Sequence, residues 1–380
     1  RPIAIEDLLG RPQKVMNRAQ ITEMIKNRRI LITGAGGSIG SEITRQVMTA
    51  EPAAVLLLDH GEHNLYQIDR YIRDHYGESD IAIEAVLGDI RDRNRIEQVF
   101  GLFKPDIVFH AAAYKHVPMI EKNPAEGVLT NTIGTRHVAD AARISGSQAM
   151  IQISTDKAVN PTNVMGATKK LAEYYCQALD LEPENKTRFL TVRFGNVLGS
   201  SGSVVPLFER QLRQGGPLTV TDPEIKRFFM TIPEAVGLVL SASAYGLSHT
   251  QERGRLFVLD MGRAIKIDEI ARQMIRLAGL VPDKDIQIEY TGLRPGEKMY
   301  EELFNSGEKS LPTDLRGIQT ARPDPIERPI LRKAISDLES SARINDISRI
   351  LDHLREYVPG FTSEKADFSS VRVMNRVSKE

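Results

Sequence analysis

Residues 30–40 read ILITGAGGSIG, and this stretch decides the fold. A short β-branched apolar run stops at Thr33, a glycine-rich turn follows, and Ile39, Ile43 and Val47 then recur at helical spacing. Strand, tight turn and helix in this order are the opening of a dinucleotide-binding βαβ unit.

Each glycine of this turn has an expected task. Gly34 allows the sharp turn off the strand, Gly37 lets the backbone approach a pyrophosphate, and Gly40 lets the helix pack tightly on the sheet. The phosphates would bind the free N–H groups at the positive end of the helix. The glycines recur every third residue, whereas the dinucleotide fingerprint reads G-x-G-x-x-G, so the turn needs support from other residues.

Two acidic residues give that support. The apolar run 55–58 ends at Asp59, about 20 residues downstream, where an acid would hold the adenosine ribose hydroxyls. A third run, 81–86, leads to Asp89, whose carboxylate could meet the adenine edge. The alternative is a set of strand-end loops with solvated carboxylates. We predict NAD rather than NADP, because Asp59 would repel a 2′-phosphate.

Length and composition exclude several classes of protein. With 380 residues, the chain can form one large α/β domain and a smaller second lobe. Fifty basic residues balance fifty acidic ones, so no charge surplus points to nucleic acid as a partner. The single cysteine, Cys176, excludes an internal disulfide and lies in a helical pattern typical of a packed residue. No apolar run approaches the ~20 residues of a transmembrane helix.

Between residue 30 and about residue 195, apolar runs alternate with segments of helical length. The runs are Ile30–Thr33, Val55–Asp59, Ile81–Val86, Ile107–His110, Met150–Ser154 and Leu190–Arg193. This alternation predicts an α/β fold, a Rossmann-type doubly wound parallel sheet with ligands at the carboxyl ends of the strands and a smaller C-terminal substrate-binding lobe. The expected division is a connector and helix (1–28), an NAD-binding domain (29–195), mainly a substrate lobe (196–305), and a C-terminal extension and tail (306–380). In the extension, a proline- and charge-rich segment precedes a helical pattern over 344–357, and residues from Thr362 onward lack periodicity.

The fifth run ends in Ser154-Thr155-Asp156-Lys157, which places a hydroxyl, an acid and an amine directly after a parallel strand. A helix with Met165 and Lys169 on one face follows. It is similar to the helix of short-chain dehydrogenases/reductases that carries Tyr-x-x-x-Lys, with Met165 in the place of the tyrosine base. A thioether cannot accept a proton, so the usual base is missing. The alternative for the triplet is a surface Asp–Lys pair on a turn.

Five segments together resemble one family. They are TGAGGSIG (33–40), HAAAYKHVP (110–118), STDK (154–157), RFGNV (193–197) and RPGEK (294–298). This is the pattern of CapD-like polysaccharide-biosynthesis proteins, which are UDP-N-acetylglucosamine 4,6-dehydratases, and the resemblance runs from about Ile3 to Phe304. Met165 and the segment IEDLLGR (5–11) resemble the large membrane-bound subgroup. That implies a homo-oligomer at the cytoplasmic face of the bacterial inner membrane, anchored by a segment ahead of Arg1.

The resemblance implies a reaction and roles for residues. C-4 of the sugar is oxidised with NAD, water is eliminated across C-5 and C-6, and the hydride returns to C-6. Asp156 would protonate the departing C-6 hydroxyl, and Lys157 would be the base at C-5, with a pKa lowered by burial or by Lys169. Thr155 would hydrogen-bond the C-4 oxygen and, with a relay to Lys169, replace the tyrosine that Met165 displaces.

The implied ligand contacts follow from the same segments. The cofactor contacts are Gly34, Gly37, Ser38, Ile39, Gly40, Asp59, Asp89, Ile90, Ala111, Ala112, Lys115, Asn131 and Lys169. The substrate contacts are Lys115, Asn196, Val205, Arg227, Arg294 and Glu297, since arginine binds diphosphate oxygens bidentately. We expect no metal site, because His110 and His116 have no third ligand at a suitable spacing.

Two other functions stay open. A 4-epimerase of the same fold would oxidise and reduce C-4 without needing Asp156 or Lys157. A catalytically silent NAD-binding sensor is the second, and Met165 is the feature that favours it.

Overall fold

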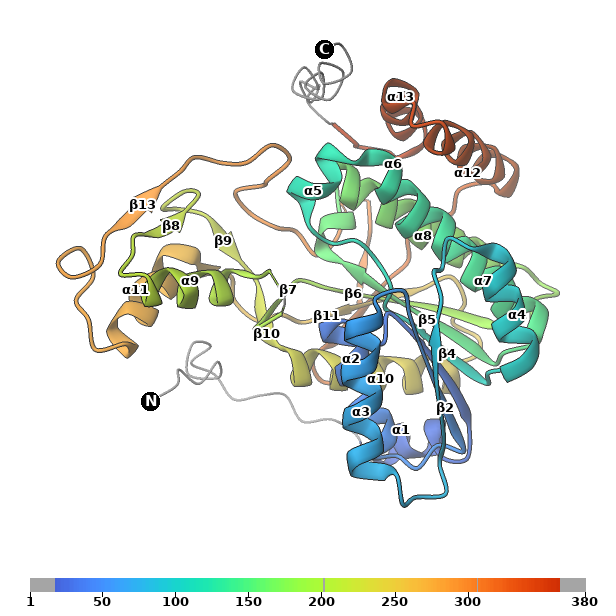
Figure 1. Ribbon diagram of the computed structural model, residues 1–380. Helices are drawn as coiled ribbons and strands as arrows, with labels where there is room; N and C mark the ends of the chain where they lie inside the picture. Colours follow the sequence, from blue (N-terminus) through green and yellow to red (C-terminus); the bar gives the residue numbers. More distant parts are fainter. Residues whose placement is uncertain (1–17, 201, 306, 363–380) are drawn as a thin grey trace, which may run out of the picture.

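The computed structural model describes residues 18–200, 202–305 and 307–362 (Figure 1). Its centre is a nine-stranded sheet in the order β14-β15-β11-β6-β5-β4-β1-β2-β3. The strands are β1 (Arg29–Thr33), β2 (Ala54–Asp59), β3 (Ala82–Leu87), β4 (Ile107–His110), β5 (Ala149–Thr155), β6 (Arg188–Phe194), β11 (Leu256–Leu259), β14 (Ser310–Pro312) and β15 (Ile318–Ala321). The order β3-β2-β1-β4-β5-β6 is the Rossmann order, and the antiparallel pairings are those of β15 with β11 and β14. The predicted fold class is confirmed.

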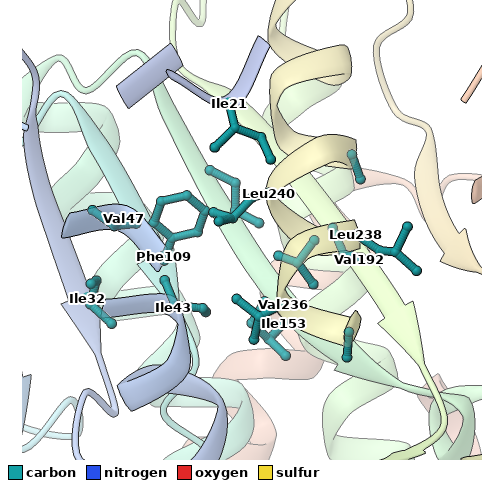
Figure 2. Packing of buried hydrophobic residues seen from close by; sticks show 14 of the residues in the cluster. Ile21, Ile32, Ile43, Val47, Phe109, Ile153, Val192, Val236, Leu238 and Leu240 are labelled. Atoms are coloured by element: carbon teal, nitrogen blue, oxygen red, sulfur yellow. The ribbon is translucent and has the colours of Figure 1, made fainter. Parts of the chain in front are cut away.

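Helices cover both faces of the sheet because successive strand residues point to opposite sides. Ile30 and Ile32 pack with one set of helices, and Leu31 between them packs with the other. The first set is α1 (Arg18–Ile25), α2 (Ser38–Met48), α3 (Glu62–Tyr76) and α10 (Ile232–Ser248), and the second is α4 (Arg93–Phe103), α7 (Thr135–Ser145) and α8 (Val164–Leu181). Figure 2 shows Ile32, Phe109 and Leu240 in the first interface. Each such buried side chain contributes about 1.5–3 kcal/mol.

A smaller lobe extends from the sheet beside β7 (Asn196–Leu198) and β10 (Phe229–Thr231), on the left of Figure 1. Its elements are α9 (Val204–Arg213), β8 (Leu218–Val220), β9 (Lys226–Arg227), β12 (Ile265–Lys266), α11 (Ile267–Leu277) and β13 (Ile288–Tyr290). It has an apolar cluster of its own, which includes Phe208 and Met274. Helix α10 and strand β11 also fall within 196–305, but they belong to the large sheet and its helical layer. The division into domains therefore stays a proposal.

The C-terminal region contains one helix that the sequence analysis missed. Helix α12 (Arg328–Arg343) begins in the proline- and charge-rich segment, for which no helix was predicted, and α13 (Ile347–Tyr357) matches the predicted helical pattern. Pro329 lies in the first turn of α12, where proline is tolerated because that N–H has no intrahelical partner. Both helices pack on α8 and on the short helix α6 (Pro124–Gly127), and α12 also packs on the π-helix η2 (Val128–Gly134). Ile120 of another short helix, α5 (Val117–Lys122), belongs to the same apolar cluster.

All six predicted strands are present, and Cys176 is buried in a helix, as its pattern predicted. The predictions for residues 1–17 and for the tail beyond Thr362 lie outside the described residues. Within the described ranges, no helix is both long enough and apolar enough to cross a bilayer.

Candidate active site

The glycine turn between β1 and α2 leaves no room for side chains. Gly34 has a φ of 66°, and a Cβ on it would lie 2.7 Å from backbone atoms of Ala112. A Cβ on Gly40 would overlap the carbonyl oxygen of Gly34. Gly37, at the N-cap of α2, makes no side-chain capping bond. Helix α2 thus begins directly after a turn of close-packed glycines, and a helix N-terminus of this kind suits a phosphate.

Asp59 binds this turn from the end of β2. One carboxylate oxygen accepts a hydrogen bond from the N–H of Gly36 (2.9 Å), and the other accepts one from Gly61 (2.8 Å). A Cβ on Gly36 would lie 2.6 Å from atoms of Asn64, so this position also requires glycine. The sequence analysis assigned no role to Gly36. Asp59 thus orders the turn, and its place at the carboxyl end of β2 fits the predicted ribose contact.

Four further predicted cofactor residues lie near the same edge of the sheet. Asp89 follows β3 and is held by two hydrogen bonds from the guanidinium of Arg91 (2.6 and 2.8 Å). Ile90 is buried. Ala111 and Ala112 follow β4, and their N–H groups donate to the end of β1 (3.1 and 3.4 Å).

Asn131 connects the segment after β4 to helix α8. Its amide oxygen accepts a hydrogen bond from the N–H of Tyr114 (2.8 Å). Its amide nitrogen donates to the C=O of Tyr114 (3.0 Å) and to the hydroxyl of Thr168 (3.1 Å). It lies in η2, and π-helices are frequent at functional sites. Lys115, the next residue after Tyr114, donates to Ser200 (3.3 Å), and burial together with the charge of Lys157 lowers its pKa.

The predicted triplet at the end of β5 converges on one buried carboxyl group. Asp156 is 1% exposed. Its Oδ1 accepts hydrogen bonds from the Thr155 hydroxyl (2.9 Å) and from Nζ of Lys157 (3.0 Å). A solvated Asp–Lys pair on a surface turn is therefore excluded, because Asp156 is inside the protein.

Glu301 is a member of this site that the sequence analysis missed. Its Oε1 lies 2.7 Å from Nζ of Lys157 and 3.3 Å from Nε of Arg227. Its Oε2 accepts a hydrogen bond from Asn196 (2.9 Å), whose amide oxygen accepts one from Lys157 (3.1 Å). The side chain of Glu301 is 5% exposed. The only sequence signal was its place three residues after the RPGEK segment.

The carboxyl groups shift the pKa of Lys157 against our expectation. Burial alone lowers this pKa, but the charges of Asp156 and Glu301 and their hydrogen bonds outweigh burial and raise it. The predicted lowering was wrong because the charge of Asp156 was not weighed against burial and the contact with Glu301 was not foreseen. Burial and the charge of Glu301 raise the pKa of Asp156, whereas the charge of Lys157 overcomes burial and lowers that of Glu301.

Met165 and Lys169 lie on helix α8 behind the triplet. The side chain of Met165 is buried in an apolar cluster and cannot carry a proton. Nζ of Lys169 donates to the carbonyl of Ile153 (2.7 Å), and burial lowers the pKa of Lys169 to about 8. A buried lysine of this kind can lose its proton near neutral pH.

The predicted substrate residues have different surroundings. Arg227 is buried and forms an ion pair with Glu297 (3.2 Å). Arg294 is exposed, and its backbone N–H donates to the carboxylate of Glu297 (3.1 Å). Val205 is buried in the apolar cluster of the lobe, while Asn196 lies beside Lys157 and Glu301. These contacts with a substrate stay predictions.

His110 is surrounded by hydroxyl groups. Its ring nitrogens bond Thr33 (2.7 Å) and Thr135 (2.9 Å), and burial lowers its pKa to about 3, so the ring is neutral. Among the described residues, no group of three or more His, Cys, Asp or Glu side chains is arranged to hold a metal ion.

The strand order β3-β2-β1-β4-β5-β6 and the glycine turn after β1 define the class of fold, that of the Rossmann-type short-chain dehydrogenases/reductases. The chain belongs to the polysaccharide biosynthesis protein family, whose model matches residues 30–323.

Two curated relatives illustrate the range of the family. The chain is 50% identical to the capsular polysaccharide biosynthesis protein CapD of Staphylococcus aureus, over 81% of this chain and 50% of that protein. It is 31% identical to a UDP-N-acetylglucosamine 4,6-dehydratase (inverting) of Campylobacter jejuni, over 79% of this chain and 84% of that protein. The chain spans about half the length of CapD and of a similar Bacillus subtilis protein, EpsC. Curated UDP-glucose 4-epimerases of Rickettsia are also similar.

Solved structures agree with the fold. The X-ray structure of Pen from Bacillus thuringiensis has a TM-score of 0.71 and 35% identity, and the match covers 80% of this chain and 92% of that one. More distant structures of the same fold, at 21–22% identity, contain NAD.

Proposed function

We propose that the chain is an NAD-dependent UDP-N-acetylglucosamine 4,6-dehydratase. The observation that carries this proposal is the buried carboxyl group of Asp156 in contact with Lys157, at the carboxyl end of a central parallel strand. Elimination of water across C-5 and C-6 needs an acid and a base in one site, whereas a 4-epimerase needs neither group. The similarity to the Campylobacter jejuni dehydratase supports the same reaction.

The residues around the glycine turn suit NAD. A pyrophosphate would bind the N–H groups of Ser38 and Ile39 at the start of α2, where Gly34 and Gly40 exclude side chains. Asp59 would hold the adenosine ribose. When bound, NAD supplies a reversible acceptor for the hydrogen that leaves C-4 and is returned to C-6.

The roles of the triplet follow from its geometry. The hydroxyl of Thr155 would hydrogen-bond the C-4 oxygen, and Lys169 behind it would serve as a relay for the C-4 hydroxyl proton. Asp156 would protonate the departing C-6 hydroxyl, while Lys157 removes the C-5 proton and later returns one. The balance is the loss of one water molecule.

The uridine diphosphate would lie toward the smaller lobe. Arg227 forms an ion pair with Glu297, and the backbone N–H of Arg294 donates to the same carboxylate. The guanidinium groups of both arginines would bind the diphosphate oxygens, since arginine does so with its planar fork. Lys115 and Asn196 would contact the sugar from the opposite side. We propose that the full-length protein is a homo-oligomer anchored at the cytoplasmic face of the membrane. A similar Methanocaldococcus jannaschii protein is described as an uncharacterized membrane protein.

A UDP-N-acetylhexosamine 4-epimerase is the second candidate, favoured by the similarity to the Rickettsia enzymes. Incubation of the purified chain with NAD and UDP-N-acetylglucosamine separates the two reactions. Mass spectrometry should detect a product lighter by one water molecule. An isomer of unchanged mass would instead indicate the epimerase, and an unchanged substrate would indicate the NAD-binding sensor.

A further inference from the structure

We propose that Glu301 completes an acid–base cluster with Asp156 and Lys157, as a positioning residue that keeps Asp156 protonated and takes up the Lys157 proton before elimination. This inference rests on the proposed dehydratase function. It adds a residue from a part of the chain far from the triplet, to which the sequence analysis assigned no role.

The first observation is how Glu301 is bound. Its carboxylate receives the shortest contact of Lys157, at 2.7 Å, compared with 3.0 Å between Lys157 and Asp156. Asn196 donates to the second oxygen of Glu301 and accepts from Lys157, so the amide orients both charged groups. Lys157 therefore has two counter-ions, Asp156 and Glu301, and Glu301 makes the shorter contact.

The second observation concerns Oδ2 of Asp156, the carboxyl oxygen that receives no hydrogen bond from the part of the chain that the structure describes. Oδ1 accepts both hydrogen bonds from Thr155 and Lys157, whereas Oδ2 is buried and no N–H or O–H of the described residues donates to it. Burial and the charge of Glu301 both raise the pKa of Asp156. A proton on Oδ2 would remove the charge from this buried carboxyl group and would relieve its repulsion by Glu301.

The third observation is the number of protons that Asp156, Lys157 and Glu301 can share. With Asp156 protonated, Lys157 charged and Glu301 ionised, three groups share two protons and the cluster is neutral. Transfer of one proton from Lys157 to Glu301 gives a neutral amine and two protonated carboxyls, with no change in total charge. That state contains the base for C-5 and the acid for the C-6 hydroxyl together. Without Glu301, Lys157 and Asp156 would form an ordinary ion pair, which contains neither.

Other charged groups face the cluster and tune it. Arg227 contacts Glu301 but also pairs with Glu297 at 3.2 Å, so its charge is shared. Lys115 is close enough to Lys157 for their charges to interact. The charge of Arg227 helps to keep Glu301 ionised, and Lys115 acts on the cluster through Lys157.

The segment that carries Glu301 is anchored on its other side. The carbonyl of Leu303 accepts a hydrogen bond from the guanidinium of Arg193 (3.1 Å), and Glu308 forms an ion pair with the same guanidinium (2.8 Å). Arg193 is fully buried in β6. Glu301 is thus held in place by a rigid strand.

The test compares Glu301→Gln with Glu302→Gln. Glu302 is the neighbouring residue, but its side chain is 51% exposed and bonds Lys298 and Asn160, outside the cluster. In E301Q, we expect kcat for water loss to fall about 10²–10⁴-fold with KM little changed, as for loss of general acid–base catalysis. Solvent deuterium at C-5 of the product should fall in parallel. E302Q should match the parent chain, and Glu301→Asp should recover part of kcat.

A second measurement needs no substrate. Carboxyl ¹³C NMR of the resting protein should show Asp156 titrating at lower pH in E301Q than in the parent chain, because the repelling charge is gone. Unchanged kcat, or an unchanged Asp156 titration, in E301Q would overturn the inference. If the parent chain releases no water from the substrate, the dehydratase proposal fails, and the NMR titration still decides whether Glu301 controls Asp156.

Discussion

Residues 301–308 contribute one carboxylate to each of two buried ionic clusters, and the two clusters differ in their charge balance. In the paired cluster, Lys170 and Arg193 face Glu173 and Glu308, with contacts of 2.7 Å (Arg193–Glu173), 2.8 Å (Arg193–Glu308) and 3.1 Å (Lys170–Glu308). Two cations match two anions.

The acid–base cluster has one lysine for two carboxyl groups, Asp156 and Glu301, and the nearby Arg227 is shared with Glu297. The charges do not balance unless a proton stays on one carboxyl. A balanced cluster can only hold the fold together, whereas an unbalanced one keeps a proton ready for transfer. The difference in charge balance therefore assigns a structural role to the paired cluster and a chemical role to the acid–base cluster.

The largest effect should come from removing the proton donor. Asp156→Asn keeps the size of the side chain and its bonds to Thr155 and Lys157 but cannot release a proton. We expect turnover to fall about 10²–10⁴-fold while NAD binding, measured by titration calorimetry, is unchanged. Turnover close to that of the parent chain would refute the acid role of Asp156.

The paired cluster should respond in stability rather than in chemistry. Arg193→Met leaves Glu173 and Glu308 buried without their main cation, which should cost about 3–5 kcal/mol in the free energy of unfolding by urea. Arg73→Met is the control, because it removes an exposed pair with Asp69 and should cost at most about 1 kcal/mol. Equal losses in the two variants would contradict the structural role.

Low pH should reduce the stability that the paired cluster contributes to the fold. Burial alone would raise the pKa of Glu308, but Arg193 and Lys170 lower it to about 2 from an ordinary value of 4.5. A lowered carboxyl pKa contributes stability above the ordinary pKa, and that contribution is lost as pH falls from about 4.5 toward 2, up to about 3 kcal/mol. Urea unfolding of Glu308→Gln should depend less on pH than that of the parent chain. Parallel curves would rule out this assignment.

High pH should reduce the turnover that depends on the acid–base cluster. Burial and Glu301 raise the pKa of Asp156, and turnover requires its protonated form. The rate should therefore fall as pH rises above that pKa, about tenfold for each pH unit. A pH–rate profile that stays flat above neutrality would show that no proton on Asp156 is needed.

The parts of the molecule that the sequence predicted depend on local signals. The glycine turn, the six strands and the family were confirmed because a turn needs glycine and a buried strand needs a continuous apolar run. The convergence of Thr155, Asp156 and Lys157 also follows from their place after one strand. The catalytic and binding roles of these residues stay predictions.

The sequence analysis failed where contacts between distant segments decide the outcome. Glu301 reaches Lys157 through the path of the chain after the smaller lobe, and no spacing pattern encodes that contact. The same contact contributes to the wrong pKa direction for Lys157, together with the charge of the adjacent Asp156. No helix was predicted for α12 because it begins in a proline- and charge-rich segment, although the first-turn position of Pro329 suits a helix.

A substrate that carries deuterium at C-4 tests the central claim most directly. The account predicts that NMR finds the label in the C-6 methyl group of the 4-keto product, because bound NAD would hold the hydride between its removal and its return. Deuterium lost to solvent, or a product whose methyl group contains none, would contradict the account.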